Sequence, residues 1–285
     1  MRYYHAFLFK INQGLMNELV NLGFEVEIGF KEVRIKENDS KLQDVLRIAA
    51  NHEYNGLIEH YYTIVPTALD LIQSSSLILI PKSLVDYIPF DNLKYLEECF
   101  DTSNACPQDP SNPANFPWKG CGLGYVQVRP FRIRTSKLHK KNLDIFVLDE
   151  HADALFVSTD LYDQVFSKIG MDYWPVIDYK SGESSTRYVQ LRITDTVELD
   201  TSELTPTVCD ICKRTKYKPL MGWYAPRPLS IDRPMSLSVQ KFGIEGEAIS
   251  LIIVNSAFYG KLREYGLKHN IFWPCADEGV RYPDI

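Results

Sequence analysis

The sequence lacks any long hydrophobic run. Its longest apolar stretches, such as LILI at 77–80 and ISLIIV at 249–254, are the size of a β-strand, far short of the roughly 20 residues that cross a bilayer. The first residues, MRYYHAFLFK, also lack the apolar segment of a secretory signal peptide. We therefore expect a soluble, cytoplasmic protein without a membrane-spanning helix.

Cysteine is scarce, with six residues in a chain of 285, and residues 1–98 contain none. So few cysteines do not make a disulfide scaffold, and reduced thiols are expected. The P-loop and the GxSxG motif are absent as well. GCGLG at 120–124 has no strand before it and no helix after it, as a phosphate-binding loop would require, and is predicted to be a plain turn.

The overall composition is that of an ordinary globular protein. Hydrophobic residues make up 45% of the chain and charged residues 24%, which excludes bulk disorder. The net charge is −6 with a pI near 5.6, which does not favour a nucleic-acid-coating protein and suits a basic protein partner. The length allows one large domain or two modest ones.

Patterning along the chain predicts an N-terminal α/β module at 1–100, a Pro-rich loop or linker at 101–122, and a C-terminal α+β region at 123–285. Residue alternation and helical spacing predict the individual elements. Strands are expected at 3–9, 77–80, 125–134, 145–149 and 185–199, and helices at 42–52, at 64–74 and after Pro81.

The clearest organisation is an internal repeat of residues 153–176 and 250–275, which both read as strand, capped helix and strand. Trp-Pro dipeptides close both copies, and glycines stand where the helices should stop. The segment 77–88 is a weaker third echo. The residues that match between the copies are Val157 with Val254, Tyr162 with Tyr259, and Val165 with Leu262. The expected helix N-caps are Ser158 or Thr159 in the first copy and Asn255 or Ser256 in the second. The glycines at the helix ends are Gly170 and Gly266. Such units predict an α+β fold of mixed sheets with helices packed on one face.

A CxxC pair, Cys209 and Cys212, lies in the Lys-rich stretch SELTPTVCDICKRTKYKP at 202–219. Zinc prefers four tetrahedral ligands, and a CxxC turn supplies two of them. Cys106 and Cys121, with fourteen residues between them, are the candidates for the other two. The alternatives are a structural turn with reduced thiols and, less favoured, a thioredoxin-like redox pair.

The order of segments over about residues 150–278 resembles the double-CxxCG motif family of bacterial immunity proteins. It runs from ALFVSTDLYDQVFSKIG through RYVQLRI and CDIC to SIDRPMSLSVQKFG and LIIVNSAFYGKLREYGLKHNIFWP. Two features depart from the family pattern. Lys213 stands where the family has Gly after the second cysteine, and the first CxxCG has no counterpart beyond Cys121-Gly122.

The resemblance implies a non-enzymatic immunity protein that binds a cognate toxin in the producing cell and blocks it, with structural zinc or no cofactor at all. Many such toxins act on nucleic acid and are basic, so an acidic surface would steer the inhibitor onto them. Charge clustering alone gives the candidate residues of that surface: Glu97, Glu98, Asp101, Asp149, Glu150 and Asp153.

Two other readings stay open. The basic runs at 129–141 and 213–218, together with Cys209 and Cys212, could form a zinc-supported nucleic-acid-binding or regulatory module. DEHAD at 149–153 could trade protons or bind metal in an enzyme, although a polar turn between two strands is the favoured interpretation. HEYNGLIEH at 52–60 lacks the spacing of a metalloprotease helix and is interpreted as a solvated helix end.

Overall fold

The computed structural model describes residues 1–51, 56–85, 98–107, 120–138, 143–149, 151–220, 222–268 and 271–277. The chain forms two compact units. Unit 1 comprises Met1–Asp70, Leu220–Tyr224 and Val280–Ile285, and unit 2 comprises Leu71–Pro219 and Ala225–Gly279.

The sequence predicts a boundary near residue 100, whereas the chain enters unit 2 at Leu71. The reason is the strand β4 (Ser76–Leu79), which belongs to a sheet of unit 2. The stretch predicted as a linker, 101–122, also lies inside unit 2, and 108–119 of it are outside the described residues.

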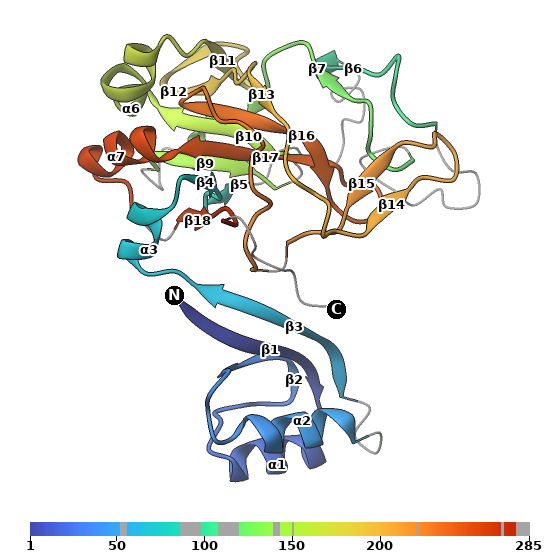
Figure 1. The fold of residues 1–285 in the computed structure, drawn as a ribbon. Coiled ribbons are helices and arrows are strands. Elements are labelled where there is room, and N and C mark those ends of the chain that lie inside the picture. Colours follow the sequence, from blue (N-terminus) through green and yellow to red (C-terminus); the bar gives the residue numbers. More distant parts are fainter. Residues whose placement is uncertain are drawn as a thin grey trace. The chain divides into compact units, whose positions relative to one another are not determined.

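Unit 1 is a three-stranded antiparallel sheet in the order β2-β1-β3, with helices on one face (Figure 1). Phe7 and Phe9 alternate along β1 toward this face and pack on Leu15 and Leu19 of the first helix. Asn12 caps that helix by accepting a hydrogen bond from the Leu15 amide at 2.9 Å. The elements are β1 (Arg2–Ile11), α1 (Gln13–Asn21), β2 (Gly29–Lys36), α2 (Leu42–Ala50) and β3 (Leu57–Val65).

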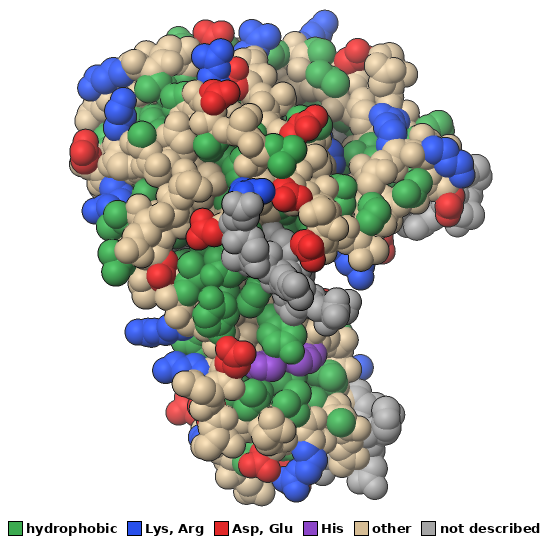
Figure 2. Space-filling view, viewed as in Figure 1, with side chains coloured by type: hydrophobic (Ala, Val, Ile, Leu, Met, Phe, Trp, Pro, Cys, Tyr) green, Lys and Arg blue, Asp and Glu red, His purple; other side chains and the backbone are tan. Residues whose placement is uncertain are grey.

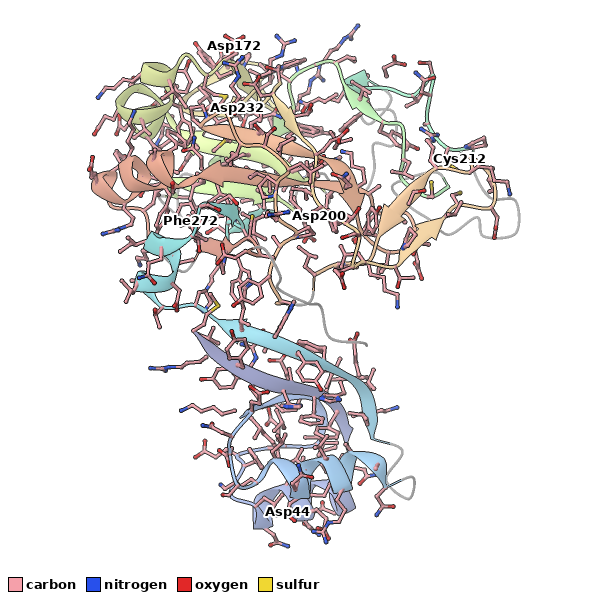
Figure 3. All side chains as sticks on the ribbon, in the orientation of Figure 1. Asp44, Asp172, Asp200, Cys212, Asp232 and Phe272 are labelled. Atoms are coloured by element: carbon pink, nitrogen blue, oxygen red, sulfur yellow. The ribbon has the colours of Figure 1, made fainter. Side chains whose placement is uncertain are left out.

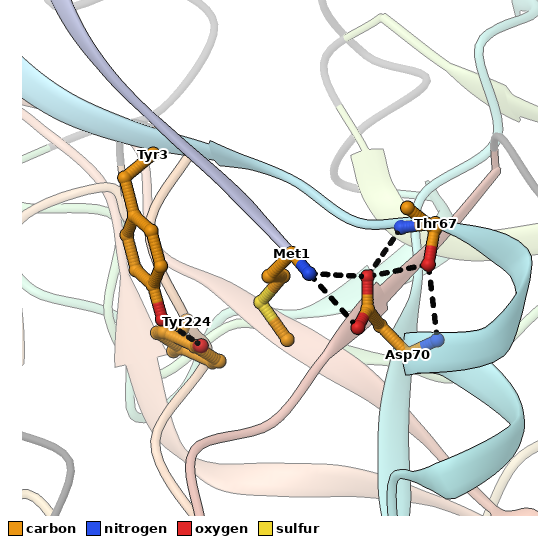
Figure 4. A network of polar contacts seen from close by, with 5 residues as sticks. All are labelled: Met1, Tyr3, Thr67, Asp70 and Tyr224. Carbon is orange, nitrogen blue, oxygen red and sulfur yellow. Dashed lines mark hydrogen bonds and ion pairs between the residues drawn. The ribbon is translucent and has the colours of Figure 1, made fainter. Parts of the chain in front are cut away.

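A capping box begins the short helix α3 (Ala68–Gln73). The Asp70 carboxylate accepts from the Thr67 amide at 2.7 Å, and the Thr67 hydroxyl accepts from the Asp70 amide at 3.3 Å. The α-amino group of Met1 lies 2.9 Å from the same carboxylate, and the Tyr3 and Tyr224 hydroxyls lie 3.2 Å apart beside this network (Figure 4). These contacts fasten β1 and the segment around residue 224 within unit 1.

Unit 2 contains a six-stranded sheet in the order β5-β9-β10-β12-β11-β8. A seven-stranded sheet has the order β14-β15-β16-β17-β4-β18, with β13 beside β16, and β6 pairs with β7 separately. Their bounds are β5 (Leu84–Val85), β6 (Phe100–Asp101), β7 (Val126–Gln127), β8 (Arg132–Ile133), β9 (Ile145–Leu148), β10 (His151–Ser158), β11 (Tyr173–Asp178), β12 (Ser184–Leu191), β13 (Thr196–Val197), β14 (Pro206–Val208), β15 (Thr215–Tyr217), β16 (Met235–Phe242), β17 (Ile249–Asn255) and β18 (Phe272–Pro274). Mixed sheets with helices make the fold α+β, as predicted.

One hydrophobic core joins the two large sheets and the helices that cover them. Val157 and Val254, which come from different sheets, are both fully buried in it. The helical segments Thr159–Ile169 and α7 (Ser256–Tyr265) lie together at one end of unit 2 (Figure 1), where the Phe166 and Phe258 rings are 5.6 Å apart. A second core on the six-stranded sheet is built around Phe146, Phe156 and Tyr188.

Both predicted repeat segments fold as strand, helix and strand. In the first, the helix is a short α-turn (α6, Thr159–Leu161), a π-turn (Tyr162–Phe166) and a 3-10 turn (Ser167–Ile169). In the second it is the regular helix α7. The predicted caps are confirmed: Ser158 accepts from Leu161, Asn255 accepts from Phe258, and both glycines end their helices with positive φ, 71° at Gly170 and 107° at Gly266.

Several predicted elements differ from the structure. Leu84 and Val85, which the sequence places in a helix after Pro81, form the strand β5 because they pair with β9, and 86–88 lie outside the described residues. The stretch 125–134 is broken into β7 and β8 around Pro130, which has no amide hydrogen for a ladder.

The predicted strand 185–199 also divides, because β12 and β13 join different sheets. Residues 57–60 belong to the strand β3, so the helix end predicted there is wrong, and 52–55 lie outside the described residues. The helix predicted at 64–74 begins only at Ala68, since β3 continues to Val65.

Candidate metal centre

Cys209 and Cys212 lie in a tight turn between β14 and β15. The Cys209 amide donates to the Arg214 carbonyl at 3.0 Å, and the Lys213 amide donates to the Cys209 carbonyl at 2.9 Å. Lys213 has φ 58°, a left-handed conformation that glycine normally takes. These bonds fold residues 209–214 into what we call the second cysteine turn, and Figure 3 labels Cys212 within it.

Cys106 and Cys121 form a similar arrangement despite the residues between them. The Cys106 amide donates to the Leu123 carbonyl at 2.9 Å, and Gly122 has φ 79°. We call Cys106 together with residues 120–124 the first cysteine turn. The predicted turn at GCGLG is therefore confirmed, and it carries one of the thiols.

The glycines of the first cysteine turn are required by close packing. A Cβ at Gly120 would lie 2.7 Å from the Cys106 sulfur, and one at Gly122 would lie 2.0 Å from the Gly246 carbonyl oxygen. At Gly124 it would lie 2.0 Å from the carbonyl oxygen of Asn104. Only glycine allows the backbone to approach the thiols and the β16–β17 hairpin this closely.

The four sulfur atoms of the two turns lie close together. All four lie within 4.8 Å of one another. The Cys106 and Cys209 sulfurs are 3.7 Å apart, and the Cys121 and Cys212 sulfurs are 3.6 Å apart. Cys106 is buried and the other three are half-buried. The structure therefore brings together all four residues that the sequence singled out as metal ligands.

The thiols have unequal proton affinities. Burial raises the pKa of Cys106 and of Cys121. Burial acts in the same direction on Cys212, but donors from Arg214 and from the neighbouring thiols outweigh it and lower the pKa of Cys212. The lowered pKa favours the thiolate form of Cys212, which is the form of cysteine that binds a metal ion.

Lys216 is a functional residue that sequence reasoning assigned to a basic surface run. Its side chain is only 5% exposed, and its ammonium donates to the carbonyls of Cys121 at 3.1 Å, Glu245 at 2.5 Å and Glu247 at 2.8 Å. Burial lowers the pKa of Lys216, while the Cys121 and Cys209 sulfurs act to raise it. The lysine thus ties the first cysteine turn to the β16–β17 hairpin and sets a positive charge beside the sulfurs. The sequence gives no signal for this burial, because alternation in β15 would place Tyr217 inside and Lys216 in solvent, whereas both neighbours of Lys216 are the more exposed residues.

The predicted acidic surface residues that the structure describes differ in exposure. Glu98, Asp101 and Asp149 are exposed, whereas Glu97 and Glu150 lie outside the described residues. Asp153 is half-buried and structural, because it accepts from the Ser250 amide at 3.0 Å and pairs with Lys241 at 3.5 Å.

DEHAD is divided between a turn and a strand. Asp149 is in the turn, and His151 begins β10, buried between the Phe100 and Phe131 rings at 5.2 and 4.9 Å. Burial lowers the pKa of His151 to about 4, so the imidazole is neutral near pH 7. Asp149, His151 and Asp153 line a cavity of about 130 Å³. The arrangement is that of a core histidine under a small polar cavity.

Where the structure describes them, the basic runs are interrupted by buried side chains. In the first, Phe131 and Ile133 are buried on either side of the exposed Arg132; in the second, Lys216 is buried. On the face in view, acidic and basic side chains alternate over unit 2 without a large field of one sign (Figure 2). This distribution does not favour tracking of a phosphate backbone.

Comparisons with protein-family models, with curated proteins and with solved structures found no match for this chain. Among the described residues, no helix has the length and apolar character needed to cross a membrane.

Proposed function

We propose that this chain is a non-enzymatic immunity protein that binds and neutralises a cognate bacterial toxin, and that structural zinc on its two cysteine turns stabilises the fold. The observation that carries the proposal is the convergence of Cys106, Cys121, Cys209 and Cys212. It supplies the second cysteine pair that the immunity-family pattern requires and that the spacing in the sequence obscured.

The sulfur geometry fits zinc. With Zn–S bonds of about 2.3 Å, a tetrahedron has S–S edges of about 3.8 Å. The two short contacts, 3.7 and 3.6 Å, match such edges, and the outer limit of 4.8 Å requires only a small inward movement. Four thiolates are the soft ligand set of structural zinc, and with every position taken by protein no open site is left for a substrate.

The departure at Lys213 is compatible with the family resemblance. The family has glycine there, and the residue takes the left-handed conformation that glycine favours, with φ 58°. The turn geometry is retained although the residue differs. This supports the assignment of residues 209–214 to a CxxCG-type turn.

Charge and surface support the neutralising role. The chain has a net charge of −6, and Glu98, Asp101 and Asp149 are exposed carboxylates of unit 2. Such a surface would attract a basic toxin and speed the encounter. The proposal places the protein in the cytoplasm of the producing cell, where thiols stay reduced and can hold zinc.

Co-expression tests this function. A candidate toxin, sought among the genes that neighbour this one, is expressed in a host with and without the chain, and growth is measured. Rescue of growth, with a complex of the two proteins on gel filtration, is the expected result. Failure to rescue despite soluble expression of both proteins would count against the immunity role.

Metal analysis of protein purified without added metal tests the zinc separately. One zinc per chain is expected, and its loss from a Cys209→Ser variant would locate it. If the chain rescues growth but contains no zinc, the immunity role stands and the structural zinc is rejected.

A further inference from the structure

Unit 2 contains two strand triplets with the same register. β12 lies between β10 and β11, β4 lies between β17 and β18, and all four pairings are antiparallel. The central cross-strand rows are Val157–Val189–Pro175 in one sheet and Val254–Leu77–Pro274 in the other. Val157 and Val254, like Pro175 and Pro274, match in the sequence repeat, and they hold equivalent places in these rows. The rows also make β12 and β4 equivalent strands.

The correspondence continues beyond each triplet, on the side of β10 opposite β12 in one sheet and on the side of β17 opposite β4 in the other. Val157 also pairs with Ile145 of β9, and Val254 pairs with Met235 of β16, again antiparallel. β5 then joins β9, and β13 joins β16, both in parallel. The parallel contacts fall three residues beyond the antiparallel ones in each case: Val85 with Leu148, and Val197 with Ser238. A register shared across five strands in two sheets is not expected of unrelated segments.

Chain order agrees with this correspondence. Val85 follows Leu77 by eight residues, as Val197 follows Val189. Among the described residues, the next strand in both cases belongs to a short antiparallel pair, β6–β7 or β14–β15. The strands β9 and β10, or β16 and β17, then precede the capped helix and the Trp-Pro strand.

The two cysteine turns correspond in the same way. The amide of the first cysteine donates to the carbonyl two residues after the second: Cys106 to Leu123, and Cys209 to Arg214. The residue after the second cysteine has positive φ in both, Gly122 at 79° and Lys213 at 58°. The turns differ in the residues inserted between Cys106 and Cys121, which hid the likeness in the sequence.

We propose that unit 2 contains two equivalent modules, one within residues 76–178 and one within 184–219 and 225–277, that have exchanged their first strands and share one metal site to which each contributes one cysteine turn. β4, the first strand of the first module, lies in the sheet of the second; β12, the first strand of the second module, lies in the sheet of the first. The exchange holds the modules together at the sheets, and the cysteine turns join them again at the end of the unit away from the helices (Figure 1). The shared metal rests on the zinc of the proposed function, whereas the strand exchange does not.

The sulfur contacts make a specific chemical prediction. Both short contacts, Cys106 with Cys209 and Cys121 with Cys212, cross from one module to the other. When metal is removed and diamide is added, both S–H bonds of such a pair break, two protons and two electrons pass to the N=N bond of diamide, which becomes the hydrazine, and an S–S bond forms. The disulfides should therefore link the modules, whereas an oxidised CxxC pair would stay within one module.

The experiment uses the full chain with a protease site inserted in the exposed turn at Lys180–Gly182, between the modules. After cleavage, the two pieces are chromatographed with and without chelator. They should elute together in both conditions, because the exchanged strands do not depend on metal. Separation of the pieces under native conditions would overturn the exchange as the main link.

The cleaved, metal-free protein is then oxidised with diamide and run on a non-reducing gel. Most of it should migrate at the mass of the uncut chain, with peptide mapping showing the two cross-module disulfides. A Cys106→Ser, Cys121→Ser double variant should stay in two pieces. This control shows that a disulfide formed by Cys99 or Cys275 does not link the pieces. Unlinked pieces carrying a Cys209–Cys212 disulfide would overturn the pairing.

Zinc affinity tests whether the two cysteine turns contribute equally to metal binding. Cys106→Ser and Cys209→Ser occupy equivalent positions and should weaken zinc binding by similar factors, within about threefold. A difference above about tenfold would show that one turn holds the metal without the other. If no zinc binds the unaltered protein, the metal part fails, while elution and disulfide mapping still decide the exchange.

Discussion

Lys213 and Gly122 hold the same backbone position in the two cysteine turns, each directly after the second cysteine and each with positive φ, 58° and 79°. Their surroundings differ. A Cβ at Gly122 would lie 2.0 Å from the Gly246 carbonyl oxygen, whereas Lys213 is exposed and carries its side chain into solvent. Both turns have the left-handed conformation at this residue, but only the first turn is packed against other residues there.

This contrast predicts unequal effects of exchange between glycine and a larger residue. Gly122→Ala should lower the free energy of unfolding by about 2 kcal/mol or more, because the new Cβ displaces the β16–β17 hairpin. Lys213→Gly should change it by less than about 1 kcal/mol, since relief of the left-handed conformation is offset by a more flexible unfolded chain. Urea unfolding of both zinc-loaded variants measures the difference, and equal destabilisation would contradict the packing described here.

The buried lysine gives a second prediction. Lys216→Met should cost about 3 kcal/mol of stability, because the carbonyls of Cys121, Glu245 and Glu247 lose a charged donor inside the protein. It should also weaken zinc binding by removing a positive charge that acts on the Cys121 and Cys209 sulfurs. The matched control is Lys218→Met on the same segment, where the side chain is exposed and little should change. Thermal unfolding and competition with a zinc chelator measure the two effects, and a Lys216→Met protein as stable as the control would refute the role.

Local chemistry in the sequence was enough to predict the strand–helix–strand segments, because their caps and terminating glycines act within a few residues. It also placed Cys209 and Cys212 in a turn and proposed Cys106 and Cys121 as their partners. The exchange of β4 could not be predicted, since its neighbour β17 is more than 170 residues away and nothing in LILI specifies which sheet it enters. The burial of Lys216 was missed because a lysine among basic residues ordinarily remains in water.

A histidine pair in unit 1 predicts a dependence on pH. His5 Nδ1 and His60 Nε2 are 3.1 Å apart, with the rings stacked at 5.3 Å and Tyr62 beside them. Burial lowers the pKa of both, with Glu37 acting to raise that of His5 and the charge of His5 further lowering that of His60. The unfolded chain therefore binds protons more readily than the folded one. Stability is complete above the ordinary histidine pKa near 6.5 and is lost as the pH falls from there toward the lowered values.

Amide hydrogen exchange of peptides from β1 and β3, measured from pH 7.5 to 5.0 and corrected for intrinsic rates, follows this loss within unit 1. Protection should decrease below pH 6.5, and a His60→Phe variant should show a shallower decrease, because one titrating ring and the histidine–histidine repulsion are gone. Protection that rises on acidification would have the wrong sign for two histidines with lowered pKa values.

The acidic surface predicts how toxin binding depends on salt. Asp101 and Asp149 are exposed, so Asp101→Asn and Asp149→Asn should leave stability unchanged but slow association with the cognate toxin, by about two- to tenfold at low salt. The effect should shrink above about 0.3 M salt, where exposed charges are screened. Asp153→Asn is the informative contrast, because that carboxylate accepts from the Ser250 amide and pairs with Lys241. It should lower stability and affect association less than the exposed positions do. Stopped-flow association rates at several salt concentrations separate steering from folding, and rates that do not change with salt would mean that the toxin contacts another surface.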